Sequence, residues 1–167
     1  HPIDPNTFYV ETQNGNIRMT QDGNIFNSAT GGIDNNDRRN WDMQYIMSAH
    51  NSNTLYTGTY RIYKSTSNGV PAWSTISGDL TDGVITSPGF HTISSLDESA
   101  IDDQFLLAGT SDGNVWKTVV FLAMSIPWSK LNFVETFDFL MLKLRLFRQL
   151  KRNEAPISIV AYLFYTQ

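Results

Sequence analysis

The sequence predicts an all-β fold built from repeated antiparallel units, and two observations support this prediction. Short apolar runs alternate with the turn pairs Asn14-Gly15 and Asp22-Gly23, and such pairs adopt the positive φ that tight hairpins need. A pattern of strand and turn residues also recurs, at a spacing of roughly 40 to 50 residues. Because Gly, Asn and Thr are frequent throughout, a helical repeat of similar length is excluded.

The first copy of the pattern occupies residues 1–26. A turn rich in Pro, Asp and Asn comes first, and strands are then expected at Phe8-Tyr9-Val10 and Ile17-Arg18-Met19. Residues 27–44 follow as a long polar connection. Long ordered connections often carry a binding surface, so we predict that the ligand-binding residues lie here. The candidates are Arg38, Arg39, Trp41 and Asp42.

The candidates in this connection differ in chemistry. The Arg38-Arg39 pair could hold a carboxylate with two hydrogen bonds, although ion pairing with nearby aspartates is the simpler expectation. Trp41 could stack on a sugar ring at the surface.

The second copy begins with a strand at Tyr45-Ile46-Met47 and is best formed from Leu55 to Ser77, a hairpin followed by a polar corner that Trp73 closes. Asn53-Thr54-Leu55-Tyr56 matches Asn6-Thr7-Phe8-Tyr9 at a shift of 47 residues, from 6 to 53. The segment therefore repeats the plan of the first copy.

The third copy places Leu106-Leu107 on Leu55-Tyr56, a shift of 51 residues from 55 to 106. Phe90 to Ser94 is expected to be its innermost strand and Asp97 to Asp103 its polar loop. Repeats of this length made of short strands are typical of propeller blades. We therefore predict a partial β-propeller of about two and a half four-stranded antiparallel blades over residues 1–118.

The pattern stops after Thr118, where an apolar run from Val119 to Met124 replaces the expected corner. Residues 119–167 are predicted to be an atypical tail of uncertain structure. Either the tail is an appended element that covers the edge of an incomplete propeller, or the reading frame was lost near residue 119. Propellers close with four or more blades, so we expect a larger chain to supply the missing blades.

Three corners of the chain resemble the Asp-box, or BNR repeat, of the form S/T-x-D-x-G-x-x-W. They are Thr20-Gln21-Asp22-Gly23-Asn24-Ile25-Phe26, the stretch from Ser65 through Gly69 to Trp73, and a third that is truncated at Lys117-Thr118. In that family the acid accepts backbone N–H groups, the glycine takes a positive φ and the aromatic ring fills the space between strands. The resemblance implies structural roles for Asp22, Gly23, Phe26, Ser65, Gly69 and Trp73. The second corner has Ser67-Asn68 where the acid should be.

Over residues 1–118 the chain resembles the Asp-box propellers of secreted bacterial proteins of the glycosyl hydrolase or sialidase-like type, and also sortilin-type propellers. The resemblance implies a secreted or cell-surface location and a glycan or protein ligand. Tyr60-Arg61-Ile62-Tyr63 ends in tyrosine rather than in the proline of the sialidase pattern. Arg61 is therefore expected to be a solvated turn residue. The leading hypothesis for the chain is a non-catalytic binding or scaffold segment.

The alternative is a fragment of a propeller glycoside hydrolase, sialidase-like or glucanase-like, whose active site is incomplete in this chain. Such an enzyme needs two carboxyl groups at one cleft. The acids of this chain are spread over its loops, and the sequence singles out no pair. The catalytic residues of this alternative are therefore unknown.

Composition excludes several other classes of function. The net charge of −4 argues against nucleic-acid binding, and the absence of cysteine excludes a thiolate metal site or nucleophile. No apolar run approaches the roughly 20 residues that a membrane span requires. No cofactor is predicted, and a metal through the scattered histidines is not expected. Calcium at Asp34-Asn35-Asn36-Asp37 or Asp79-Leu80-Thr81-Asp82 is a minor alternative.

Overall fold

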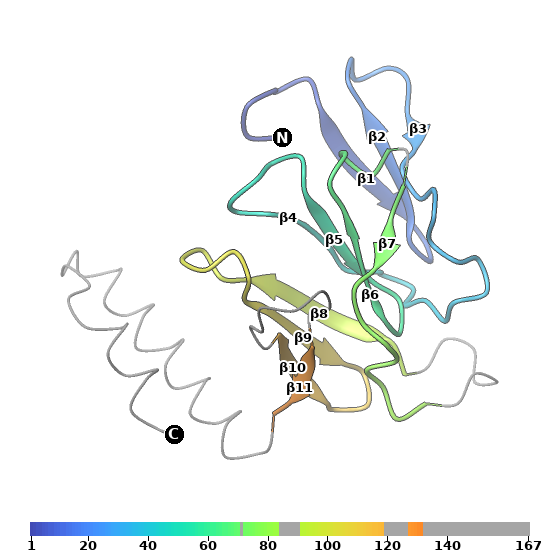
Figure 1. Cartoon of the computed structure of the whole chain (residues 1–167). Helices are drawn as coiled ribbons and strands as arrows, with labels where there is room; N and C mark the ends of the chain where they lie inside the picture. The colour runs from blue at the N-terminus through green and yellow to red at the C-terminus, as the bar shows by residue number, and fades with distance from the viewer. Residues whose placement is uncertain (71, 84–90, 119–126, 132–167) are drawn as a thin grey trace, which may run out of the picture. The chain divides into compact units, whose positions relative to one another are not determined.

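Three antiparallel sheets follow one another along the chain in the computed structural model (Figure 1), which describes residues 1–70, 72–83, 91–118 and 127–131. The first sheet has the order β1 (Phe8–Thr12), β2 (Asn16–Thr20), β3 (Asn27–Ser28). The second has the order β4 (Tyr45–Met47), β5 (Leu55–Gly58), β6 (Ile62–Ser65), β7 (Ser74–Thr75). The third has the order β8 (Ile93–Glu98), β9 (Leu106–Thr110), β10 (Val115–Thr118), β11 (Trp128–Lys130). The all-β prediction is confirmed for these residues.

The strands keep the spacing that the sequence predicts. The strands β1, β5 and β9 begin at Phe8, Leu55 and Leu106, which are the residues that the repeat aligns. Two boundaries differ from expectation. A two-residue strand, β3, lies at the start of the connection, and β8 continues through Asp97 and Glu98 because they pair with Leu107 and Leu106 of β9. Phe90 lies outside the described residues.

The turn before each of these strands is also repeated, in hydrogen-bonding detail. In each turn a backbone nitrogen donates to the carbonyl oxygen six residues later. The three bonds run from His1 to Thr7 at 2.8 Å, from Ser48 to Thr54 at 2.8 Å and from Ser99 to Phe105 at 2.9 Å. Within each turn a side-chain oxygen accepts the backbone N–H two residues on, and these acceptors are Asp4, Asn51 and Asp102. Side-chain caps of this kind favour a turn over a continuing strand. The three copies are therefore local structural equivalents as well as sequence repeats.

The second sheet is covered on both faces, and Figure 1 shows it between the first and the third. Successive side chains of a strand point to opposite faces, so Leu55 packs toward the first sheet and Tyr56 toward the third. All four residues of β5 are buried for this reason. The core between the first two sheets consists of Ile17, Met19, Ala29, Ile33, Met43, Leu55, Tyr63 and Trp73. The core between the second and third consists of Tyr56, Ile62, Leu80, Ile93, Leu96, Leu106 and Ala108.

The third sheet continues beyond Thr118, where we expected the repeat to stop. Its fourth strand, β11, pairs antiparallel with β10, with Trp116 opposite Lys130 and Thr118 opposite Trp128. The predictions for residues 119–126 and 132–167 lie outside the described residues.

The chain divides into two units, His1–Lys130 and Leu131–Gln167, and all the described strands belong to the first. Only Leu131 of the second unit is described. Within the described ranges there is no helix, and hence none that is long and apolar enough to cross a membrane.

Candidate functional site

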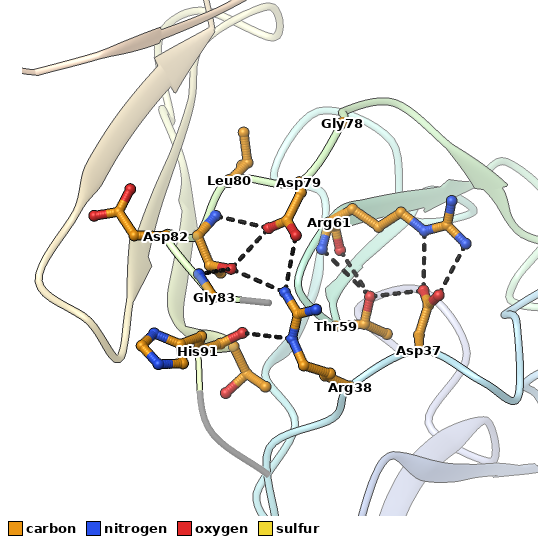
Figure 2. A network of polar contacts seen from close by, with 12 residues as sticks. Asp37, Arg38, Thr59, Arg61, Gly78, Asp79, Leu80, Asp82, Gly83 and His91 are labelled. Carbon is orange, nitrogen blue, oxygen red and sulfur yellow. Dashed lines mark hydrogen bonds and ion pairs between the residues drawn. The ribbon is translucent and has the colours of Figure 1, made fainter. Parts of the chain in front are cut away.

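The connection between the first and second sheets carries a buried carboxylate, Asp37, at its centre. Its side chain is only 2% exposed. It accepts hydrogen bonds from Thr59 Oγ1 at 2.9 Å and from Nε and Nη2 of Arg61 at 3.0 and 2.9 Å (Figure 2). It also accepts one from Tyr63 Oη at 2.6 Å. A buried charge needs this full set of donors to be tolerated.

The contacts around Asp37 shift the pKa values of Asp37, Arg61 and Tyr63. Burial works to raise the pKa of the Asp37 carboxyl, but hydrogen bonds from Arg61, Tyr63 and Thr59 and the charge of Arg61 outweigh it and lower the pKa. The hydrogen bond to Asp37 raises the pKa of Arg61, and burial followed by the same carboxylate raises the pKa of Tyr63 to about 12. Arg61 is thus a partner of Asp37, not the solvated turn residue that the sequence suggested.

The next residue, Arg38, points the other way, toward the connection between the second and third sheets (Figure 2). Its Nη2 atom donates to Asp79 Oδ2 at 2.8 Å and to Thr81 Oγ1 at 3.0 Å. Its Nε atom donates to the carbonyl oxygen of His91 at 3.4 Å, and its guanidinium lies 4.4 Å from the centre of the Tyr60 ring. The side chain is 3% exposed. Arg38, predicted as a ligand-binding residue, is therefore buried and occupied by internal partners.

Arg39 is held by backbone carbonyl groups of its own connection and of the turn between β1 and β2. Its Nη2 atom donates to the carbonyl oxygen of Asp34 at 3.0 Å, and Nη1 donates to that of Asn14 at 3.5 Å. The ion pairs expected for Arg39 with neighbouring acids are replaced by these carbonyl contacts. Arg39 fixes the shape of the connection from within.

Trp41 is the exposed large apolar residue of this connection, with 66% of its surface accessible. Its backbone is nevertheless fixed, because the N–H of Asn14 donates to the Trp41 carbonyl oxygen at 2.9 Å and Met43, two residues on, is fully buried. Asp42 is exposed beside it. The structure thus exposes the indole of Trp41 and the carboxylate of Asp42 on a backbone that is fixed by internal contacts.

Glu11 supports this loop from the first sheet. Its Oε1 atom accepts the backbone N–H groups of Gly15 at 2.8 Å and Met43 at 3.0 Å. Burial raises the pKa of Glu11, the two hydrogen bonds lower it, and the negative charge of Asp42 raises it further; the net shift is upward. Glu11 and Asp42 therefore interact electrostatically next to Trp41. The sequence did not single out Glu11, whose only local signal is its place before the Asn14-Gly15 turn.

The first Asp-box-like corner joins β2 to β3. Asp22 Oδ1 accepts the backbone N–H groups of Asn24 at 2.8 Å and Ile25 at 2.9 Å, and Thr20 Oγ1 accepts that of Gly23 at 2.9 Å. Gly23 has a φ of 74°. The ring of Phe26 meets that of Phe8 edge-on, with the ring centres 5.7 Å apart.

The second corner joins β6 to β7 without an acid. Ser65 Oγ accepts the backbone N–H of Gly69 at 3.0 Å, and Gly69 has a φ of 76°. Trp73 is buried and donates its indole N–H to the carbonyl oxygen of Ala29 at 2.7 Å. A serine hydroxyl thus caps a backbone N–H in this turn as Thr20 does in the first.

A third turn of the same chemistry lies between β9 and β10, at Thr110 to Asn114. Thr110 Oγ1 donates to Asp112 Oδ1 and accepts the backbone N–H of Asn114 at 3.0 Å. Asp112 Oδ2 also accepts the backbone N–H of Asp82 at 2.6 Å and lies 3.1 Å from Nδ1 of His91. The run Thr110-Ser111-Asp112-Gly113-Asn114 repeats the Thr-x-Asp-Gly-Asn of residues 20–24, a signal that could have located it.

No family model, curated protein or solved structure matches this chain. Among the described residues no group of three or more His, Asp and Glu side chains could hold a metal ion. The two loops considered for calcium use their carboxylates locally, since Asp34 Oδ1 caps the N–H of Asn36 and Asp79 Oδ1 that of Thr81. A calcium ion there remains an untested prediction. The site therefore offers the exposed indole of Trp41 and, next to it in the sequence, the exposed carboxylate of Asp42, on a backbone that hydrogen bonds hold in place.

Proposed function

We propose that this chain is a non-catalytic binding and scaffold segment of an Asp-box β-propeller, with a glycan as its ligand. The proposal draws on the three repeated sheets, on the face-to-face cores that join them, and on capped turns of the Asp-box type. Further blades, from a larger chain or from further copies of this one, would complete the ring. The resemblance to secreted bacterial propellers favours a location outside the cell or at its surface.

The exposed indole of Trp41 is the observation that carries the binding proposal. A large aromatic side chain left in water at 66% exposure is available for an external partner. Sugar rings offer apolar faces that stack on indole, and their hydroxyl groups donate to carboxylates such as that of Asp42. Because Asn14 holds the Trp41 carbonyl group and the buried Met43 anchors the chain two residues on, little conformational freedom is lost on binding.

The acids that accept internal hydrogen bonds support a role without catalysis. The carboxylates of Asp37, Asp79 and Asp112 all accept hydrogen bonds from the fold itself. A hydrolase needs one carboxyl group free to donate a proton and another free to act on water or on the sugar. These three groups instead act as structural links between connections.

The test is to titrate the protein with a panel of soluble polysaccharides by calorimetry, with Trp41→Ala as the variant. We expect the variant to bind at least about tenfold more weakly, because an aromatic anchor is lost. Ile25→Ala, which also truncates an exposed apolar side chain, is the matched control and should bind normally. Equal binding by wild type and Trp41→Ala would contradict the glycan proposal, and binding of proteins alone would move the ligand to the protein class.

The second candidate function is a fragment of a propeller glycoside hydrolase, and one observation favours it. Glu11 is half-buried and burial raises its pKa, with a smaller contribution from the charge of the exposed Asp42, and catalytic carboxyl pairs combine two such unlike environments. Polysaccharide turnover that disappears in both Glu11→Gln and Asp42→Asn would establish this candidate. Binding without turnover would leave the scaffold proposal in place.

A further inference from the structure

The outer face of the first sheet carries apolar side chains that are partly open to solvent, beside the exposed Arg18, which pairs opposite Val10. Tyr9, Ile17 and Met19 pack toward the second sheet, so Phe8 and Val10 point to the opposite face by strand alternation. Phe8 is 40% exposed, and Phe26 rests against it. We call Phe8, Val10 and Phe26 the outer patch.

The repeat shows what residues in these positions do elsewhere in the chain. Leu55 and Leu106 begin β5 and β9 as Phe8 begins β1, and each is buried against the preceding sheet. Trp73 follows Phe26 by the repeat shift of 47 residues, from 26 to 73, and it packs in the core shared with the first sheet. The outer patch is therefore the surface by which a sheet of this repeat covers its predecessor.

The far face of the third sheet presents the complementary surface. Leu107 lies opposite Lys117 as Tyr56 lies opposite Lys64, and Val115 lies opposite Gly109 as Ile62 lies opposite Gly58. Tyr56 and Ile62 are the residues on which the third sheet packs. Leu107 and Val115, their equivalents, are half-buried.

We infer that the outer patch is an interface for a second copy of this chain, which places the Leu107 and Val115 face of its third sheet there. The contact continues the packing already present between the three sheets. The inference rests on the repeated sheets of the proposed function but not on glycan binding. Its two surfaces differ, so the association is head-to-tail and closes into a ring if the rotation allows. Phe26 suits such a contact because, unlike Trp73, it has no N–H that must find an acceptor.

Sedimentation velocity over a wide range of protein concentration tests this inference. We expect reversible self-association of the wild type and at least about a tenfold weaker association of Phe8→Ser. Ile101→Ser, which changes a 73% exposed apolar residue outside the patch, is the matched control and should associate as the wild type does. Circular dichroism of each variant verifies that it is folded.

Val115→Lys provides a second variant that blocks the opposite surface. Each variant alone should associate at least about tenfold more weakly than the wild type. An equimolar mixture of Phe8→Ser and Val115→Lys should form a heterodimer through the one pair of intact surfaces. A wild type that is monomeric at every concentration would overturn the inference, and so would a dimer that neither substitution weakens. Because Trp41 is not in either surface, these outcomes are separate from the failure of glycan binding.

Discussion

Trp73 donates its indole N–H to the carbonyl oxygen of Ala29, 2.7 Å away, and so ties the second sheet to the end of the first. Trp128 makes the equivalent bond to Ile76 at 3.0 Å, between the third sheet and the second. The two acceptors are themselves equivalent, since Ala29 and Ile76 each donate their N–H to the isoleucine carbonyl, Ile17 or Ile62, of the neighbouring strand. An equivalent tryptophan therefore ties each sheet to its predecessor, and at the second junction Trp116 adds another indole bond, to the carbonyl oxygen of Leu80 at 2.6 Å.

Trp73→Phe should lower the free energy of unfolding by about 1 to 2 kcal/mol, because a buried carbonyl oxygen loses its donor while most of the ring volume remains. Trp73→Ala should lower it by about 3 to 5 kcal/mol, since a cavity opens in the shared core. Urea denaturation followed by tryptophan fluorescence or circular dichroism measures both.

Trp41→Phe is the control for this pair, because the Trp41 side chain is exposed. Its effect should stay within about 0.5 kcal/mol. A Trp73→Phe variant as stable as the wild type would show that the indole bond does not hold the junction.

The turn residues made most of the fold predictable. Asn14-Gly15 and Asp22-Gly23 mark the turns that bound β2, and the repeat placed the starts of β5 and β9 correctly. The fourth strand of the third sheet was missed because the apolar run after Thr118 resembles no turn. A signal was nevertheless present, since Trp128-Ser129 repeats Trp73-Ser74 at the start of a fourth strand.

The site was less predictable, because its partners are brought together by the stacking of sheets. Arg38 and Asp79 are separated by 41 residues, and no local pattern relates them. Asp37 and Arg61 likewise come from different elements, which is why Arg61 looked like a free turn residue. The exposure of Trp41 was predicted correctly because it depends only on the polar connection around it.

Asp37→Ala should lower the free energy of unfolding by about 3 kcal/mol. The change leaves Arg61 with only its longer ion pair to Asp34, at 3.6 Å, and removes the carboxylate acceptor of the Thr59 and Tyr63 hydroxyls. Asp42→Ala, in the same connection but exposed, should change it by less than about 0.5 kcal/mol. Equal losses in the two variants would contradict a special role for Asp37.

The contribution of Asp37 should also depend on pH. Its folded pKa lies below the ordinary aspartate value, so the stabilisation is complete above about pH 4 and is lost as the pH falls through the folded pKa. The difference in stability between the wild type and Asp37→Asn should therefore shrink in acid. Urea midpoints measured at a series of pH values below 5 test this, and a constant difference would contradict it.

Gly15→Ala should lower the free energy of unfolding by about 2 to 4 kcal/mol. Gly15 has a φ of 71°, and an added Cβ would collide with the side chain of Met43, which is buried in the core. Gly23→Ala is a matched control, since its φ is 74° but nothing lies within 4 Å of the added atom, so only the backbone strain of about 1 kcal/mol applies. Equal losses of stability in the two variants would show that the Met43 side chain moves away from the added Cβ at little cost in free energy.

Glu11 should show the opposite pH dependence from Asp37. Its folded pKa is raised, first by burial and then by the charge of Asp42, so the folded state holds the proton more tightly than the unfolded state does. The wild type should therefore lose stability as the pH rises from the unfolded pKa, about 4.3, through the folded pKa, and remain level above it. Glu11→Gln keeps an oxygen acceptor for Gly15 and Met43 but cannot titrate. Its stability relative to the wild type should increase across that interval, as measured by urea midpoints between about pH 3 and 7. A relative stability that falls with rising pH would mean that the two backbone hydrogen bonds, and not burial, dominate the ionisation of Glu11.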